Sequence, residues 1–268
     1  MRTIVVCVKW TAPPGADVSD DRFAGVSAAD QAALETALRL GEVHGCEVVV
    51  ATVGPEGADR ALRDALACGA TRAVRVDAPL DADSRDVAFE LAQATGEADV
   101  VLCGDYSLDR GSGSVPAFIA HHRHAAQALG LVSVDVEGCT TDTVHVVRRL
   151  DGGRREVLRV PTPCVLSVEG SVASLRRASL RGALASRDAA VEVRIAPPAH
   201  HRSAPAIVTP YRPRARVMPA PAGDDPLARL RALTDATGAP ARGETVTGTP
   251  AEAAARIAQA LRDWGYLT

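Results

Sequence analysis

The residues best suited to chemistry lie in the loop GDYSLDRGSGSVPAF, residues 104–118, which leaves a predicted strand and enters a predicted helix. Gly111, Ser112, Gly113 and Ser114 occupy the turn where that helix begins. Small residues let backbone N–H groups face outward, the helix N-terminus adds partial positive charge, and the serines add hydroxyl donors. This combination suits a phosphate, although a flexible loop with a serine cap would give the same pattern. Neither G-x-G-x-x-G nor G-x-x-x-x-G-K-[ST] occurs, so the standard dinucleotide and ATPase signatures are missing.

Lys9, the only lysine in the chain, closes the first predicted strand. It could face a nucleotide or be a solvated charge at a strand end, and the sequence favours neither. His121, His122 and His124 lie in one predicted helix with no carboxylate or cysteine cluster at ligand spacing. A helix face or a partner contact is therefore favoured over a metal site.

Carboxylate pairs at 20–21 and 81–83 have no histidine or nucleophile motif beside them, and neither G-x-S-x-G nor S-x-x-K occurs. We therefore predict no catalytic residue and no metal site, and we expect a protein that is not an enzyme.

The elements that must position this loop alternate between strand and helix over the first 135 residues. Continuous apolar strands such as IVVCV are typical of a sheet covered on both faces. Ser27 is the predicted N-cap of the first helix, and Gly45 its end. The alternation predicts an α/β fold, a mostly parallel doubly wound sheet that binds ligands outside the carboxyl ends of its strands. The predicted strands are 4–8, 47–53, 72–77, 98–104 and 131–136, and the predicted helices are 28–45, 55–70, 84–96 and 115–130.

The pattern changes after about residue 138. Residues 142–168 predict an antiparallel hairpin extension that turns at Asp151–Gly152–Gly153, followed by another strand. A last strand is expected at 191–195, and two helical pieces are expected near the end of the sequence, the second with Thr249 as its cap. We predict an α/β domain over 1–195, a Pro-rich linker over 196–226, and a C-terminal helical arm over 227–268 that docks on a partner.

Composition narrows the function further. The net charge of −3 and pI near 6.2 argue against nucleic-acid or membrane-surface binding. No apolar run approaches the roughly 20 residues that cross a bilayer, and the apolar part of the N-terminus is too short for a secretion signal. The six cysteines form no C-x-x-C pair. We interpret them as reduced core residues of a cytoplasmic protein.

Taken in order, these motifs resemble the beta subunit of electron transfer flavoproteins, closely over residues 1–195. VGPEGADRALRDALACGATRAVRV gives the strongest match, to the family's run ending in A-L-A-M-G-A-D-R. VVCVKW resembles the first strand of the family, DVVLCGDYSLDRGSGSVPAF its nucleotide loop, and VVRRLDGGRREVLRVPTPCVLSV its signature segment. The sequence also departs from the family, since Ser27–Ala28 replaces Asn-Pro and Ser114 replaces the Gln of the loop.

The resemblance implies an adenine-nucleotide-binding, Rossmann-like domain within a heterodimer. Electrons would pass from flavin-dependent or other dehydrogenases to a downstream acceptor through FAD held mainly by an alpha subunit, with a structural AMP in this chain. Two alternatives stay open. One is a second FAD in the AMP site that supports electron bifurcation, and the other is a stand-alone adenine-nucleotide-binding signalling protein.

The resemblance also implies the residues of two contact surfaces. Val172 and Arg176 are expected to contact the partner subunit. The nucleotide is expected to contact Cys7, Lys9, Ser27, Ala28, Ala29, Asp30, Val53, Ser107, Leu108, Asp109, Arg110, Gly111, Ser112, Gly113, Ser114 and Val115.

Overall fold

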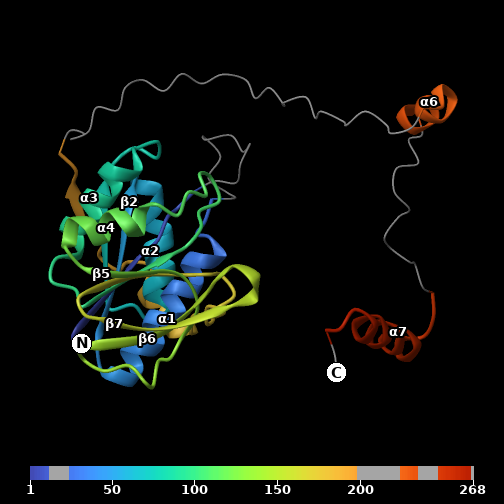
Figure 1. Ribbon diagram of the computed structural model, residues 1–268. Coiled ribbons are helices and arrows are strands. Elements are labelled where there is room, and N and C mark those ends of the chain that lie inside the picture. The colour runs from blue at the N-terminus through green and yellow to red at the C-terminus, as the bar shows by residue number, and fades with distance from the viewer. Residues whose placement is uncertain (12–23, 198–223, 235–246, 267–268) are drawn as a thin grey trace. The chain divides into compact units, whose positions relative to one another are not determined.

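The structure is a computed structural model of the 268-residue chain. It describes residues 1–11, 24–197, 224–234 and 247–266 (Figure 1). The chain divides into two compact units, Met1–Pro205 and Ala206–Thr268.

The first unit is built on one mixed sheet whose nine described strands have the order β7-β6-β5-β8-β4-β1-β2-β3-β9. The β5–β6 and β6–β7 pairs are antiparallel, and every other neighbouring pair is parallel. This confirms the predicted mostly parallel sheet with a hairpin extension. The strands are β1 Thr3–Cys7, β2 Glu47–Gly54, β3 Arg72–Asp77, β4 Val100–Gly104, β5 Ala126–Val134, β6 Thr143–Arg149, β7 Arg155–Pro161, β8 Cys164–Val168 and β9 Glu192–Ile195.

Helices cover both faces of the sheet, as a doubly wound fold requires (Figure 1). Alternate residues of β1 point to opposite faces. Ile4 and Val6 pack in a cluster with α1 and α2, whereas Val5 and Cys7 pack in a cluster with α3 and α4. The helices of this unit are α1 Ala28–His44, η2 Glu56–Ala58, α2 Asp59–Cys68, α3 Ser84–Thr95, α4 Val115–Arg123, η3 Asp151–Gly153 and α5 Leu180–Ala185.

The ends of α1 follow the predicted capping residues. The Ser27 hydroxyl accepts a hydrogen bond from the Asp30 backbone N–H at 3.0 Å. Gly45 closes the helix in the left-handed region at φ 66°. The hairpin of β6 and β7 likewise turns at the predicted Asp151–Gly153, where both glycines have positive φ.

One predicted helix is too long. A helix was expected over 115–130, but α4 ends at Arg123, and His124 takes the left-handed conformation at φ 50°. The next residues form β5, which pairs with β8 and buries Ala128 and Leu131 in the core. The local helical pattern is overridden because strand pairing with β8 buries these side chains and bonds their backbone. The strand therefore begins at Ala126 rather than at residue 131.

The second unit contains α6, Pro226–Thr234, and α7, Pro250–Asp263. Thr249 caps α7 in a reciprocal capping box with Glu252, as its sequence predicts. Most of the expected linker, residues 198–223, lies outside the described residues. Within the described ranges, the structure contains no helix with the length and apolarity needed to span a membrane.

A close contact joins the N-terminus of α1 to the end of β4. A Cβ atom on Gly104 would lie 2.6 Å from the Asp30 carboxylate Oδ1 and 2.8 Å from the Ala29 carbonyl carbon. Real Cβ atoms do not approach other atoms so closely, so only glycine fits at this position. The contact brings the start of α1 over the carboxyl ends of β1 and β4.

We expect Gly104→Ala to lower the free energy of unfolding by about 1–3 kcal/mol, because α1 must move away from β4 to accommodate the methyl group. Gly54→Ala is the matched control. Gly54 also ends a strand, and its added Cβ would lie at an ordinary 3.6 Å from the Ala58 Cβ. Urea denaturation of both variants tests the contact. Equal destabilisation would contradict it.

Candidate functional site

A cavity opens at the carboxyl edge of the sheet, above the point where β1 separates β2 on one side from β4 on the other. In doubly wound sheets this switch point is the usual place for ligands. The cavity has a volume of about 100 Å³, within a hollow of about 850 Å³ that includes open solvent. Its walls come from the ends of β1, β2 and β4, the loop after β4, and the starts of α3 and α4.

Most of the predicted nucleotide-binding residues meet at this cavity. Those that line it are Cys7, Lys9, Asp30, Val53, Ser107, Arg110, Ser112, Gly113, Ser114 and Val115. The others expected at the nucleotide lie outside the lining: Ser27, Ala28, Ala29, Leu108, Asp109 and Gly111. Ser27 and Ala29 are buried within the start of α1, and Asp109 supports the loop through Lys9.

One wall of the cavity was missed from the sequence. Pro79, Leu80, Ala82 and Ser84 line it from the segment between β3 and α3. The rule that brought the segments after β1, β2 and β4 to the same sheet edge applies equally to the segment after β3. The signal was therefore available in the strand order, although the residues form no motif. Trp10, directly after Lys9, was also missed and lies in the same lining.

The loop between β4 and α4 exposes an unusual set of backbone donors. Gly113 has φ 58°, and a Cβ there would lie 2.8 Å from the Asp105 carbonyl oxygen, so the turn requires glycine. No side chain caps α4 at Ser114. The backbone N–H groups of Ser112, Gly113, Ser114 and Val115 donate to no other described residue. Together with the positive end of the α4 dipole, these donors can bind an anion.

The middle of the same loop is held by ionic side chains. Arg110 donates from its two terminal nitrogens to the carbonyls of Ala82 and Asp81, each at 2.9 Å. The Lys9 ammonium lies 2.5 Å from the Asp109 carboxylate. Burial alone would raise the pKa of Asp109, but the hydrogen bond from Lys9 and its neighbours brings it to about 2. The charge of Lys9 is thus balanced within the chain, which leaves backbone N–H and serine hydroxyl groups as the anion donors.

Asp30 forms the floor of the cavity between β1 and β4. Its side chain accepts a hydrogen bond from the Lys9 backbone N–H at 3.1 Å, and the residue is only 6% exposed. Burial raises the pKa of Asp30 to about 6, because the carboxylate loses more in hydration than its hydrogen bonds return.

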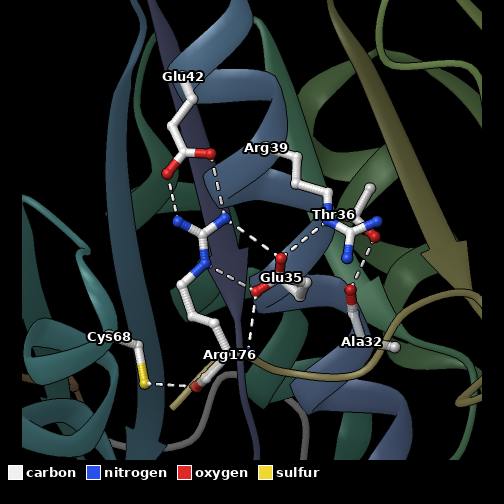
Figure 2. A network of polar contacts seen from close by, with 7 residues as sticks. All are labelled: Ala32, Glu35, Thr36, Arg39, Glu42, Cys68 and Arg176. Carbon is white, nitrogen blue, oxygen red and sulfur yellow. Dashed lines mark hydrogen bonds and ion pairs between the residues drawn. The ribbon is translucent and has the colours of Figure 1, made fainter. Parts of the chain in front are cut away.

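The two residues expected at a partner surface make contacts inside the chain. Val172 packs against the core cluster, and its N–H donates to the Glu169 carbonyl. Arg176 lies between two carboxylates of α1 (Figure 2). Its Nε donates to Glu35 at 2.9 Å and its Nη2 to Glu42 at 3.1 Å, and the backbone N–H also donates to Glu35 at 3.0 Å.

This network anchors the segment that follows β8 to two helices. Burial alone would raise the pKa of Glu35, but bonds from Arg176 and Arg39 bring it below its usual value. The Arg176 carbonyl in turn accepts from the Cys68 thiol of α2 at 3.6 Å. Partner contact by Val172 and Arg176 stays a prediction.

Comparison with known proteins extends these observations. Residues 18–199 match the family model described as "Electron transfer flavoprotein domain". Protein FixA of Rhizobium meliloti (strain 1021) is 35% identical over 164 residues, which cover 58% of this chain and 56% of that protein. The electron transfer flavoprotein subunit beta of Methylophilus methylotrophus is 33% identical over 196 residues, 67% of this chain and 74% of that protein. That of Syntrophomonas wolfei is 31% identical over 199 residues, 69% and 76% of the two chains.

The fold and the cavity define a doubly wound α/β protein whose cavity, at the switch point of the sheet, is suited to bind an anion. The chain belongs to the electron transfer flavoprotein family and is similar to its beta subunits, which confirms the resemblance found in the sequence. The matched region spans less than two-thirds of the FixA relatives, 56% of the Rhizobium meliloti protein.

The buried carboxyl of Asp30 gives a pH test. Because its folded pKa is raised from 3.8 to about 6, its contribution to stability is fully present below pH 4 and is lost as the pH rises through 6. Between pH 4 and 7 we expect Asp30→Asn to gain stability relative to the unchanged protein, by up to about 3 kcal/mol. Urea titrations across this range measure the difference.

The exposed carboxylate of Asp188 provides the control for this test. Asp188→Asn should leave the pH profile of stability unchanged. If the difference in free energy of unfolding between Asp30→Asn and the unchanged protein does not vary with pH, the raised pKa of Asp30 is contradicted.

Proposed function

We propose that this chain is the beta-type subunit of a heterodimeric electron transfer flavoprotein. It would pass electrons from dehydrogenases to a downstream acceptor through FAD held mainly by the alpha subunit, with no substrate chemistry of its own. The observation that carries the proposal is the set of unbonded backbone N–H groups at Ser112–Val115, which opens into the switch-point cavity of a member of this family.

In this proposal the cavity binds AMP as a structural ligand. The N–H groups of Ser112–Val115 and the hydroxyls of Ser112 and Ser114 would hold its phosphate. Those two hydroxyls lie 3.0 Å apart, so one acceptor can reach both. Apolar side chains of Val53, Val87 and Leu91 line the cavity and suit the face of a base.

A monophosphate fits this donor set better than a longer phosphate chain does. Lys9 is paired with Asp109, and Arg110 points to the carbonyls of Ala82 and Asp81. No other lysine exists in the chain to neutralise additional phosphates. AMP bound to the native state alone would stabilise the fold by mass action. FAD at the subunit interface would supply reversible one- and two-electron transfer when bound.

Two surfaces would serve the partner subunit. The segment after β8, which contains Val172 and Arg176, would contact it, and the bonds of Arg176 to α1 would keep that segment ordered. The C-terminal arm would dock through α7 and the residues that follow it. Ile257, Trp264 and Tyr266 are large apolar or aromatic side chains that are mostly exposed within their own unit. Exposed large apolar and aromatic side chains, one on α7 and two just after it, are typical of a binding surface.

The nucleotide assignment is tested by extraction and mass detection. We expect purified protein to release AMP in near-equimolar amount, and Gly113→Val to lower that content at least about tenfold, because the side chain strains the turn and displaces the donors. Gly130→Val is the matched control. Gly130 also has positive φ, at 68°, but lies on β5 outside the cavity lining.

Each outcome of the extraction has a distinct meaning. Release of FAD instead of AMP would replace the structural nucleotide with a second flavin. Equal nucleotide content in Gly113→Val and in Gly130→Val would contradict the phosphate-loop assignment.

The subunit assignment is tested by coexpression with an alpha-type subunit from the same organism. We expect a yellow 1:1 complex that survives gel filtration, since the alpha subunit would hold FAD against this chain. Removal of residues 247–268 should weaken this complex and leave the α/β unit folded. A monodisperse, colourless protein that does not bind the alpha-type subunit would instead favour a stand-alone nucleotide-binding signalling protein.

A further inference from the structure

Two cysteines lie side by side at the floor of the cavity. Cys7 is the last residue of β1 and Cys103 the penultimate residue of β4, and the parallel register places them directly opposite each other. Both side chains belong to the cluster on the α3 and α4 face, and both line the cavity. The two residues are 6% and 4% exposed.

The other four cysteines of the chain have different surroundings. Cys46, Cys68 and Cys139 donate to the backbone carbonyls of Met1, Arg176 and Asp135, respectively. Cys164 is buried opposite Val100 on one neighbouring strand and Ala126 on the other. Cys7 and Cys103 instead lie opposite each other on paired strands, and the neighbouring Cys7 thiol, together with burial, raises the pKa of Cys103 well above its usual value.

Neighbouring strands place this pair within reach of a covalent bond. Directly paired residues of a sheet lie about 4.8 Å apart at their Cα atoms, and a disulfide spans about 4.4–6.8 Å between Cα atoms. The side chains point to the same face, so their sulfur atoms need little more than a change of rotamer to meet. The open cavity above them gives a small reagent access.

We propose that Cys7 and Cys103 form an oxidisable dithiol, which a hydroperoxide converts to a disulfide when the cavity holds no ligand. One thiol attacks the peroxide, is oxidised to the sulfenic acid and releases one water. The second thiol then attacks that sulfur, the S–S bond forms, and a second water leaves. Overall, two thiols are oxidised to one disulfide while one hydrogen peroxide is reduced to two waters.

The protonated state of Cys103 makes this a slow reaction, because the thiolate is the nucleophile. The dithiol therefore responds to sustained oxidant rather than to a brief pulse. Protection by ligand rests on the proposed nucleotide site, whereas the formation of the disulfide does not. A nucleotide over the cavity floor would block the peroxide, and a disulfide would tie the ends of β1 and β4 together beneath the loop.

The test treats the full chain, dialysed free of nucleotide, with hydrogen peroxide, then alkylates the remaining thiols before digestion with trypsin. Cleavage after the Arg and Lys residues gives Thr3–Lys9 and Asp86–Arg110, each with a single cysteine. We expect these two peptides to be joined in the unreduced digest and separate after reduction. The link should be lost in Cys7→Ala and in Cys103→Ala and kept in Cys164→Ala, which removes an equally buried thiol.

A second arm repeats the oxidation with AMP present. At about 100 times its Kd, AMP should slow the formation of the link about 100-fold, since only the ligand-free fraction reacts. If the link forms equally fast while mass detection shows AMP bound, the proposed protection of the dithiol by the nucleotide is contradicted. If AMP does not bind but the link forms, the nucleotide proposal fails and the dithiol stands. Absence of the link while Cys46 or Cys68 oxidises would overturn the dithiol.

Discussion

The close contact between Gly104 and the start of α1 is the constraint on which the rest of the site depends. It holds the Asp30 carboxyl against the ends of β1 and β4, where a side chain on residue 104 would leave no room. With α1 so placed, the cavity lies on the opposite side of the β1–β4 crevice, between the loop after β4 and the starts of α3 and α4. The fold therefore keeps a buried carboxyl, disfavoured in its charged form, in the lining of the cavity.

Electrostatic balance determines what this cavity can bind. Its cationic side chains are engaged with the protein itself, Lys9 with Asp109 and Arg110 with two backbone carbonyls. These contacts order the loop before any ligand arrives, so binding needs little further ordering. The remaining attraction for an anion comes from backbone dipoles, which are fixed in direction and carry no full charge. This arrangement is consistent with the structural nucleotide proposed above.

The sequence predicted the fold well where local and tertiary preferences agree. Ser27 begins α1, Gly45 ends it, and the β6–β7 hairpin turns at Asp151–Gly153, as the residue types predict. The continuous apolar strands correctly indicated a sheet covered on both faces. The prediction was wrong at 124–130, because pairing with β8 decided the structure there and no local signal reports it. The loop at 111–114 was found through its small residues. Its restraint by Arg110, which bonds carbonyls that no residue type marks, could not be read from the sequence.

The salt-bridge network of Arg176 has a mechanical consequence. Glu35 lies about one and a half helical turns from Asp30 on α1, and a helix of this length is stiff. The helix therefore acts as a lever with one end at the cavity floor and its middle bonded to the segment after β8. A shift of Asp30 would therefore be transmitted through α1 to Glu35 and to Arg176 in the segment after β8.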